Sequence, residues 1–315
     1  MSGAEKFFNR WDLKVLPFRF DTIAAPLSFG YNTAVQSIPP TRKFSMKRRD
    51  FLTAGTAGLA AIAATTPLEA QVLLQRRTAS RAPVFTEVRK YTVKDADKRT
   101  KLVEILDNAL IPALNRQGVK PVGVLIPFAE GGEAKYANNI FVVAQHNTMD
   151  SFVSANTKLL ADSRYMKDAA PIFETNSKDP VYTDCETWLL KNFPSVPQIE
   201  VPDLGPDRVF QARHYRSFNI ERNAAKVKMF DKGGEVALFR EVNMHPIFFG
   251  DVVAGTKMPA LLYMIGFASP EKRDAAWREF GSHPKWQAMR SLPEYADTAT
   301  EIDNVMLKPS PKSQI

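Results

Sequence analysis

Residues 87–91 read Glu-Val-Arg-Lys-Tyr, and residues 211–215 read Gln-Ala-Arg-His-Tyr. Each stretch opens one half of the chain, and a helical pattern of apolar residues follows it. Similarity between two segments of one chain indicates an internal repeat. Outward from these stretches, each half shows the order strand, helix, strand, strand, helix, strand. The sequence therefore predicts two copies of one βαββαβ unit.

Apolar residues that recur every three or four positions predict helices, and alternation predicts strands. In the first half this spacing predicts strands at 84–92, 120–128, 138–146 and 182–190, and helices at 95–117 and 149–161. Leu102, Leu106, Ala109 and Ala113 share one face of the first helix, where Pro112 should introduce a kink. In the second helix the residues expected to face inward are Met149, Phe152, Val153, Asn156 and Leu160.

The second half repeats this order. Its predicted strands are 208–216, 235–242, 260–268 and 301–308, and its predicted helices are 219–231 and 270–280. Lys232-Gly233-Gly234 is expected to be a turn, because glycine adopts positive φ at little cost. Residues 244–255 are expected to form a loop in which Phe248 and Phe249 act as a lid or a dimer contact.

The fold class follows from the two apolar faces of the predicted sheets. A βαββαβ unit carries both helices on one face of an antiparallel sheet. Here the other face is also apolar, so it needs a second cover, and the simplest cover is the sheet of the other half. The prediction is an α+β fold with two tandem ferredoxin-like units in a dimeric-α/β-barrel-like arrangement. A barrel shared between two chains is the alternative.

The predicted domain boundaries follow the repeat. The first unit spans 83–194 and the second spans 207–309, with the proline-rich linker 195–206 between them and a C-terminal tail at 310–315.

The N-terminal region carries an export pattern. In residues 46–70, Arg48 and Arg49 precede Phe51-Leu52 and a mildly apolar stretch, which resembles a twin-arginine signal peptide. We therefore expect a periplasmic or otherwise exported protein. Because such signals stand at the start of a chain, residues 1–45 are interpreted as a non-native upstream extension, with a long basic leader region as the alternative. Residues 71–82 are interpreted as a linker.

Composition excludes several classes. The net charge is +8 over 315 residues, but beyond residue 70 basic and acidic residues are interspersed, so nucleic-acid binding is not expected. The longest weakly apolar run, 51–64, is shorter than the roughly 20 residues of a membrane span. Cys185 is the only cysteine, and the four histidines show no metal-binding spacing, so neither a metal site nor a cofactor is expected.

A series of short motifs marks the second half. It comprises Phe210-x-x-Arg213-x-Tyr215, Lys228-Met229-Phe230, Gly234-Glu235, Pro246 to Gly250, Met258-Pro259-x-Leu261-x-Tyr263, Trp277-x-x-Phe280, Pro284-x-Trp286 and Pro293-Glu294-Tyr295. The ordered series resembles the NIPSNAP family, over residues 83–315 but weakly in the first half. The resemblance implies barrel domains of the dimeric α/β type without established catalytic residues. Related barrels include cofactor-free monooxygenases, haem-degrading enzymes, and ligand-binding or assembly domains.

The candidate site residues lie on the first strand of each unit. Glu87, Arg89 and Tyr91 share one strand face, as do Gln211, Arg213 and Tyr215. If the two sheets face each other, both sets line one cavity for a small anionic or aromatic ligand. The other candidates for this pocket are Arg240, His245, Phe249 and Tyr263. The alternative is a set of internal ion pairs that involve Glu87, or that join Arg213 or Arg240 to Glu235 or Glu241.

These observations predict an exported NIPSNAP-like protein that binds small molecules or a protein partner, and that forms a homo-oligomer. The alternative is a small-molecule enzyme of the cofactor-free monooxygenase-like barrel type. Its distinguishing feature would be a closed pocket with a polar base beside an aromatic wall. The sequence alone leaves open whether the protein is an enzyme.

Overall fold

The computed structural model describes residues 84–128 and 134–315. The predicted upstream extension 1–45, the signal peptide 46–70 and the linker 71–82 lie outside the described residues.

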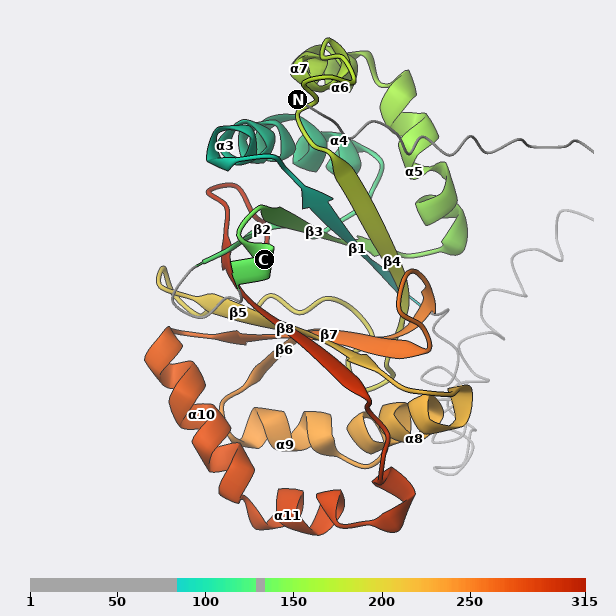
Figure 1. Cartoon of the computed structure of the whole chain (residues 1–315), viewed down its shortest axis with the longest axis vertical. Helices are drawn as coiled ribbons and strands as arrows, with labels where there is room; N and C mark the ends of the chain where they lie inside the picture. Colours follow the sequence, from blue (N-terminus) through green and yellow to red (C-terminus); the bar gives the residue numbers. More distant parts are fainter. Residues whose placement is uncertain (1–83, 129–133) are drawn as a thin grey trace, which may run out of the picture. The chain divides into compact units, whose positions relative to one another are not determined.

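Eight antiparallel strands form one closed barrel (Figure 1). They are β1 (Phe85–Thr92), β2 (Val122–Pro127), β3 (Asn139–His146), β4 (Asp184–Asn192), β5 (Val209–Arg216), β6 (His245–Ala254), β7 (Ala260–Phe267) and β8 (Glu301–Pro309). Around the barrel the order is β1-β3-β2-β8-β5-β7-β6-β4. The predicted α+β content and the predicted barrel are thus confirmed.

Each half contributes four neighbouring strands to this barrel. The first half runs β4-β1-β3-β2 and the second runs β8-β5-β7-β6, which is the same relative order. The halves join where β2 pairs with β8 and where β4 pairs with β6. The barrel therefore closes within one chain, without strands from a second copy.

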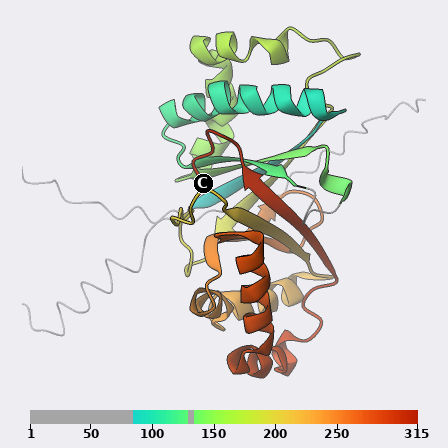
Figure 2. The same ribbon diagram turned by 90° about the vertical axis from the view of Figure 1, so that its left-hand side faces the viewer.

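Helices cover the barrel on two opposite outer sides (Figures 1 and 2). Those of the first half are α3 (Ala96–Ile105), the π-helix η2 (Leu106–Leu110), α4 (Ile111–Arg116), α5 (Met149–Ala161), α6 (Ser163–Asp168) and α7 (Ala170–Phe173). Those of the second half are α8 (Ile220–Phe230), α9 (Glu235–Glu241), α10 (Pro270–Ser282) and α11 (Pro284–Arg290). Two 3₁₀ turns, η3 (Ala134–Tyr136) and η4 (Pro293–Tyr295), complete the described elements.

Strand alternation divides the buried side chains among three clusters. One cluster lies inside the barrel, and one lies between the strands and the helices of each half. In β6, Phe248 belongs to the cluster inside the barrel and the next residue, Phe249, to the cluster under the helices of the second half. Every strand therefore has two buried faces, as expected from the two apolar faces in the sequence.

Two predicted elements of the second half are wrong. Residues 235–241 form helix α9, which begins after Gly234 at φ +94°, and not a strand. Residues 245–254 form strand β6, and the register shifts between Pro246 and Phe248, where the ladder tolerates a proline. Phe248 and Phe249 are fully buried in this strand, so they form neither a lid nor a dimer contact.

Helix α5 has the predicted bounds but presents a different face to the core. Ala155 and Leu159 are buried, whereas Val153 is 68% and Leu160 is 61% exposed. The apolar residues of this helix cover more of its circumference than the packing uses. The periodicity of the apolar residues alone therefore predicted the wrong buried face for α5.

The segment after β8 seals the barrel at one end. Gln314 N donates to the carbonyl of Val122 at 3.0 Å, and Val122 N donates to Gln314 Oε1 at 2.9 Å. The side chain of Ile315 then packs over Gly123, where a Cβ atom would lie 2.7 Å from Ile315 Cδ1. Glycine at 123 is therefore required by this close approach.

Gly234 and Gly281 provide a matched test of the start of α9. A Cβ atom meets no heavy atom within 4 Å at either position, but only Gly234 has a positive φ. Gly234→Ala should lower the free energy of unfolding by about 1–2 kcal/mol, because L-residues resist this region. Gly281→Ala, near the end of α10, should instead raise it by up to about 1 kcal/mol. Urea denaturation measures both, and equal losses would contradict the assignment.

Candidate functional site

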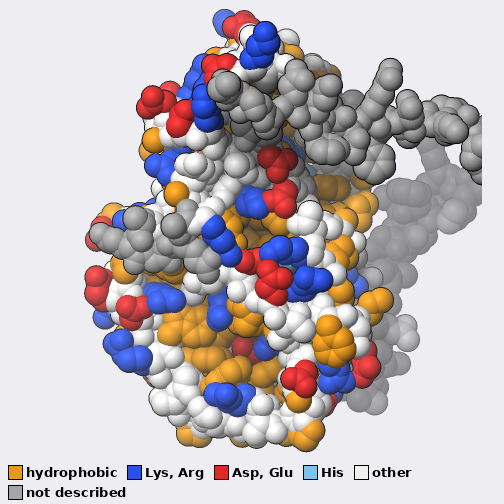
Figure 3. All heavy atoms as spheres, viewed as in Figure 1, with side chains coloured by type: hydrophobic (Ala, Val, Ile, Leu, Met, Phe, Trp, Pro, Cys, Tyr) orange, Lys and Arg blue, Asp and Glu red, His pale blue; other side chains and the backbone are white. Residues whose placement is uncertain are grey.

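A hollow of about 410 Å³ lies between the outer face of the barrel and the helices of the second half. We call it the second-half pocket. Its lining residues are Arg213, Tyr215, Lys226, Glu235, Trp277, Phe280, Trp286, Tyr295, Asp297, Thr298, Ala299 and Ile302. Hydrophobic side chains gather on the lower half of the face seen in Figure 3, where these helices lie. The pocket combines aromatic walls with four charged side chains, those of Arg213, Lys226, Glu235 and Asp297.

Strand β5 supplies the cationic centre. Arg213 lies opposite Tyr263 of β7, and its Nη1 donates to the Tyr263 hydroxyl at 3.3 Å. The guanidinium lies between two rings, 5.1 Å from the centroid of Tyr215 and 4.9 Å from that of Trp277. Its Nε is buried and has no hydrogen-bond partner among the described residues. A buried donor without a partner is costly, so Arg213 is prepared to bind an acceptor.

A buried lysine and a buried glutamate stand beside Arg213. Lys226 of α8 is 7% exposed and Glu235 of α9 is 3% exposed, and their Nζ and Oε2 atoms lie 3.6 Å apart. Glu235 Oε2 has no hydrogen-bond partner among the described residues. Burial raises the pKa of Glu235 and lowers that of Lys226, because desolvation disfavours both charged forms. Burial therefore favours the uncharged form of each side chain.

A stack of aromatic rings holds this polar group in place. Tyr263 is fully buried and stacks on Phe249, with centroids 4.6 Å apart and planes 9° apart. Phe230 packs at 5.1 Å from Tyr263, and the Tyr263 hydroxyl donates to that of Tyr215 at 3.4 Å. Burial keeps the pKa of Tyr263 well above its usual value, so its hydroxyl remains protonated. Rigid rings of this kind fix the position of Arg213.

Gln211 positions the wall of the pocket. Its Oε1 accepts from Trp277 Nε1 at 2.6 Å, and its Nε2 donates to Asn304 Oδ1 at 2.6 Å. Trp277 in turn covers Arg213. Gln211 therefore orients the indole although it is not among the residues that line the pocket.

The two sets of candidates do not share a cavity. Alternation places Arg213 and Tyr215 on the outer face of β5, and it places Glu87, Arg89 and Tyr91 on the outer face of β1, under the helices of the first half. The even positions between them face into the barrel. The expectation that both sets line one cavity is therefore wrong, because the sheets face each other through the opposite residues.

In the first half the candidates form a satisfied ion pair. Arg89 Nε lies 2.6 Å from Glu87 Oε1, and His146 Nε2 lies 3.0 Å from Glu87 Oε2. The other ring nitrogen of His146 is 3.0 Å from Ser151 Oγ at the start of α5. Burial alone would raise the pKa of Glu87, but Arg89 and His146 lower it to about 2. His146 is completely buried, so this chain of contacts clamps α5 to the sheet. Tyr91 joins the same core and packs edge-on to Tyr182 at 5.1 Å.

The remaining candidates have separate positions. Phe249 lies in the ring stack, whereas Arg240 forms an exposed ion pair with Glu200 at 2.7 Å. His245 is the first residue of β6, and burial followed by the charge of Arg240 lowers its pKa. Neither Arg240 nor His245 lines the second-half pocket.

The sequence prediction missed Lys226, Glu235 and Trp277 as lining residues. Glu235 was assigned to a strand, and a lysine on a helix usually points to solvent. Both Glu235 and Trp277 stand in the motif series, which was the available signal. Within the described residues, no group of three or more His, Cys, Asp or Glu side chains is arranged to hold a metal ion. Among the described helices, none is both long and apolar enough to cross a membrane.

Comparison with known proteins identifies the second half. The NIPSNAP family profile matches residues 210–314, so this part of the chain carries a NIPSNAP domain. The profile match includes the second-half pocket, where Arg213, Tyr215, Glu235, Tyr263, Trp277 and Trp286 of the motif series meet. No curated protein sequence matches the chain.

Several solved structures share parts of the architecture at low identity. A candidate monooxygenase from Lactobacillus acidophilus is 11% identical, with a TM-score of 0.49, and the match covers 72% of this chain and 94% of that one. A second one, from Fusobacterium nucleatum, is 12% identical, with a TM-score of 0.48, and the match covers 73% and 94%. A NIPSNAP family protein from Agrobacterium tumefaciens is 18% identical, with a TM-score of 0.31, over 34% of this chain and 98% of that one.

The Glu87 ion pair predicts a pH-dependent stability. Glu87→Gln should lower the free energy of unfolding by roughly 3–5 kcal/mol at pH 7, because Arg89 stays buried without a counter-charge. Glu87 has a pKa of about 2 in the fold against an ordinary value of 4.5. Its contribution is therefore complete above pH 4.5 and is lost as the pH falls towards 2.

Urea unfolding at pH 7, 5 and 3 measures the difference between wild type and Glu87→Gln. We expect a constant difference at pH 7 and 5 and a smaller one at pH 3. Glu104→Gln, on an exposed helical position, is the matched control and should leave stability unchanged. A difference that is independent of pH would show that the charge of Glu87 does not stabilise the fold.

Proposed function

We propose that the chain binds a small molecule with a planar aromatic body and one anionic group in the second-half pocket. The observation that carries this proposal is the half-buried Arg213, which lies against the rings of Tyr215 and Trp277 and whose buried Nε has no partner among the described residues. A guanidinium in this setting pairs with a carboxylate or a similar anion through charge-assisted hydrogen bonds. Rings on both sides favour a ligand that is itself flat.

The charge balance of the pocket supports an anion. Arg213 and Lys226 bring two cationic groups, and Glu235 and the exposed Asp297 bring two carboxyl groups. Burial raises the pKa of Glu235 and so favours its uncharged form, which leaves the cationic groups in excess. Burial lowers the pKa of Lys226, and an anion bound beside it would favour its charged form. The volume of about 410 Å³ suits a bicyclic aromatic acid, since ligand pockets range from about 300 to 1,000 Å³.

Arg213→Gln tests the proposal with 2-naphthoate as the probe. The substitution removes the charge and keeps a polar side chain of similar length. We expect the dissociation constant of the full chain, measured by isothermal titration calorimetry, to rise roughly ten- to hundredfold, as the loss of one hydrogen bond to a charged group implies.

Arg240→Gln is the matched control, because Arg240 is an arginine of the same half that lies outside the pocket. It should change the dissociation constant less than twofold. Circular dichroism checks that both variants fold. Equal effects of the two substitutions, or no binding of 2-naphthoate by the wild type, would refute the proposal.

The alternative is a small-molecule enzyme of the cofactor-free monooxygenase-like barrel type. One observation favours it, since Glu235 is a buried carboxyl of raised pKa beside an aromatic wall, which suits a general base near neutral pH. In this role Glu235 accepts a proton from the bound substrate. Oxygen uptake with hydroxynaphthoates distinguishes the two functions: uptake that disappears in Glu235→Gln supports an enzyme, and no uptake supports a binding protein.

The organisation of the chain supports a finer proposal about its two halves. The shared strand order and the two similar pentapeptides at the start of β1 and β5 favour tandem ferredoxin-like units of NIPSNAP type at 83–194 and 207–309. On this basis we propose that the linker 195–206 joins two copies of one ancestral unit. We also propose that the assembled barrel forms homo-oligomers or binds a protein partner.

We also propose export by the twin-arginine route, which rests on Arg48-Arg49-x-Phe51-Leu52 and the mildly apolar residues that follow. Replacement of both arginines by lysine should retain the protein in the cytoplasm of a bacterial host, whereas the wild type should reach the periplasm. Cell fractionation and immunoblotting measure the distribution. A variant that is exported as well as the wild type would exclude this route.

A further inference from the structure

The inside of the barrel holds a second cavity. Its volume is about 370 Å³, and we call it the barrel cavity. Protein interiors are close-packed, and voids larger than a water molecule are few. An engineered apolar cavity of about 150 Å³ already binds benzene. A space of this size inside a closed barrel is therefore a candidate for a ligand-binding site.

Most of the wall is apolar. The lining residues inside the barrel include Val88, Phe141, Val143, Phe248, Leu262, Met264, Val305 and Leu307. Ile199 and Ile315 belong to the same buried cluster and pack at the end where β1 begins and β8 finishes. The barrel cavity is thus a mainly apolar chamber that is covered at this end.

Two side chains on the wall, Arg213 and His214, have a buried nitrogen without a hydrogen-bond partner among the described residues. His214 of β5 is only 8% exposed and lines the cavity, and its Nε2 has no hydrogen-bond partner among the described residues. Its ring lies 6.0 Å from the ring of Trp188, which lines the same chamber. Burial lowers the pKa of His214, so the imidazole is neutral and offers one donor and one acceptor. A neutral ligand with a hydroxyl group satisfies this imidazole.

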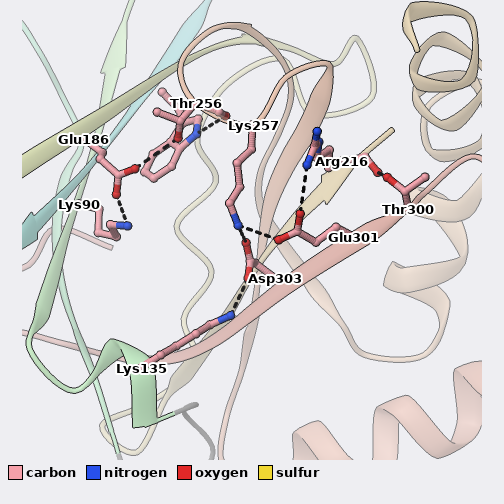
Figure 4. A network of polar contacts seen from close by, with 10 residues as sticks. Lys90, Lys135, Glu186, Arg216, Thr256, Lys257, Thr300, Glu301 and Asp303 are labelled. Atoms are coloured by element: carbon pink, nitrogen blue, oxygen red, sulfur yellow. Dashed lines mark hydrogen bonds and ion pairs between the residues drawn. The ribbon is translucent and has the colours of Figure 1, made fainter. Parts of the chain in front are cut away.

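Charged side chains at the open end are paired with one another. Figure 4 shows Lys257 between Glu301 and Asp303, with Nζ to oxygen distances of 2.7 and 3.0 Å. Lys135 also binds Asp303, and Lys90 binds Glu186. Trp188 Nε1 donates to the carbonyl of Thr256 at 3.1 Å, which ties the β6–β7 connection to β4. Among the charged residues that line the barrel cavity, Arg213 alone has no ion pair within the described part of the chain, and Arg213 also lines the second-half pocket.

We propose that the barrel cavity is a second binding site, which takes an uncharged aromatic alcohol and bonds its hydroxyl to His214. The ring of such a ligand fills the apolar chamber beside Trp188. The ion pairs of Figure 4 lie at the open end of the cavity. Arg213 lines both this site and the second-half pocket, whereas His214 lines only the barrel cavity and Tyr215 lines only the second-half pocket, so substitutions at other positions can test the two sites separately.

The probe is 2-naphthol, which differs from 2-naphthoate in the group that it carries and from naphthalene by its hydroxyl. We expect the wild type to bind 2-naphthol at least tenfold more tightly than naphthalene, measured by quenching of tryptophan fluorescence. His214→Phe should reduce this preference to less than threefold, because it removes the hydrogen bond and keeps an apolar ring. An unchanged preference in His214→Phe would overturn the assigned role of His214.

Val305→Phe fills the barrel cavity without touching His214, and Val153→Phe, at an exposed position of α5, is the matched control. Val305→Phe should weaken 2-naphthol at least tenfold and change 2-naphthoate less than twofold, which also shows that it folds. Val153→Phe should change neither. Retained 2-naphthol binding in Val305→Phe would overturn the proposal, whatever the second-half pocket binds.

Discussion

Every strand of this protein must be covered on two sides. Each four-stranded sheet is apolar on both faces, and its helices cover only one of them. The remaining face finds its cover when β2 pairs with β8 and β4 pairs with β6, which closes the two sheets into one barrel. Burial of apolar surface contributes about 25 cal/mol per Å², so leaving one face of each sheet in water would cost more than a domain's net stability. The barrel is therefore a requirement of the strand composition.

Closure also decides what kind of chemistry each residue can take part in. Along β5, His214 lines the chamber inside the barrel, Tyr215 lines the pocket under the helices, and Arg213 lines both. The side chains of this one strand thus line two cavities that differ in their charged groups. At the open end of the chamber, Lys90, Lys135 and Lys257 are paired with carboxylates. Outside, a guanidinium, an ammonium and a carboxyl group share a small desolvated space with aromatic rings.

The sequence predicted the parts of the fold that depend on long periodic segments. Helix α5 has the predicted bounds, and β1, β3, β5 and β7 lie within one residue of theirs. The prediction of a strand was wrong for residues 235–241, because seven positions are too few to distinguish a helix from a strand. In addition, Gly233-Gly234 is compatible with a hairpin turn as well as with the start of a helix. Pro246 led to the prediction of a loop, and only the shift in register along β6 shows how the sheet accommodates it.

The candidate site was predictable in part for the same reason. The sharing of one face by Arg213 and Tyr215 follows from the period of a strand, and the pairing of Arg213 with Tyr263 follows from the register of β5 and β7. Which face would be enclosed by the barrel does not follow from the period. Lys226 of α8 contacts Glu235 of α9. The distance between these two helices depends on tertiary packing, so no local sequence pattern predicts this contact.

The β2–β8 seam has a consequence for the life of the chain before it is folded. β2 ends at residue 127 and β8 ends at residue 309. During synthesis, β2 therefore cannot pair with β8 until the residues between them have been translated. At about 5–20 residues per second, that interval lasts roughly ten to forty seconds. Throughout it, the β8-facing edge of β2 has unpaired backbone groups, and so does the outer edge of β4 from its own synthesis until β6 is made. Such edges are the usual templates for association between chains. The length of the second half therefore sets the period during which a nascent molecule is most exposed to aggregation on the ribosome.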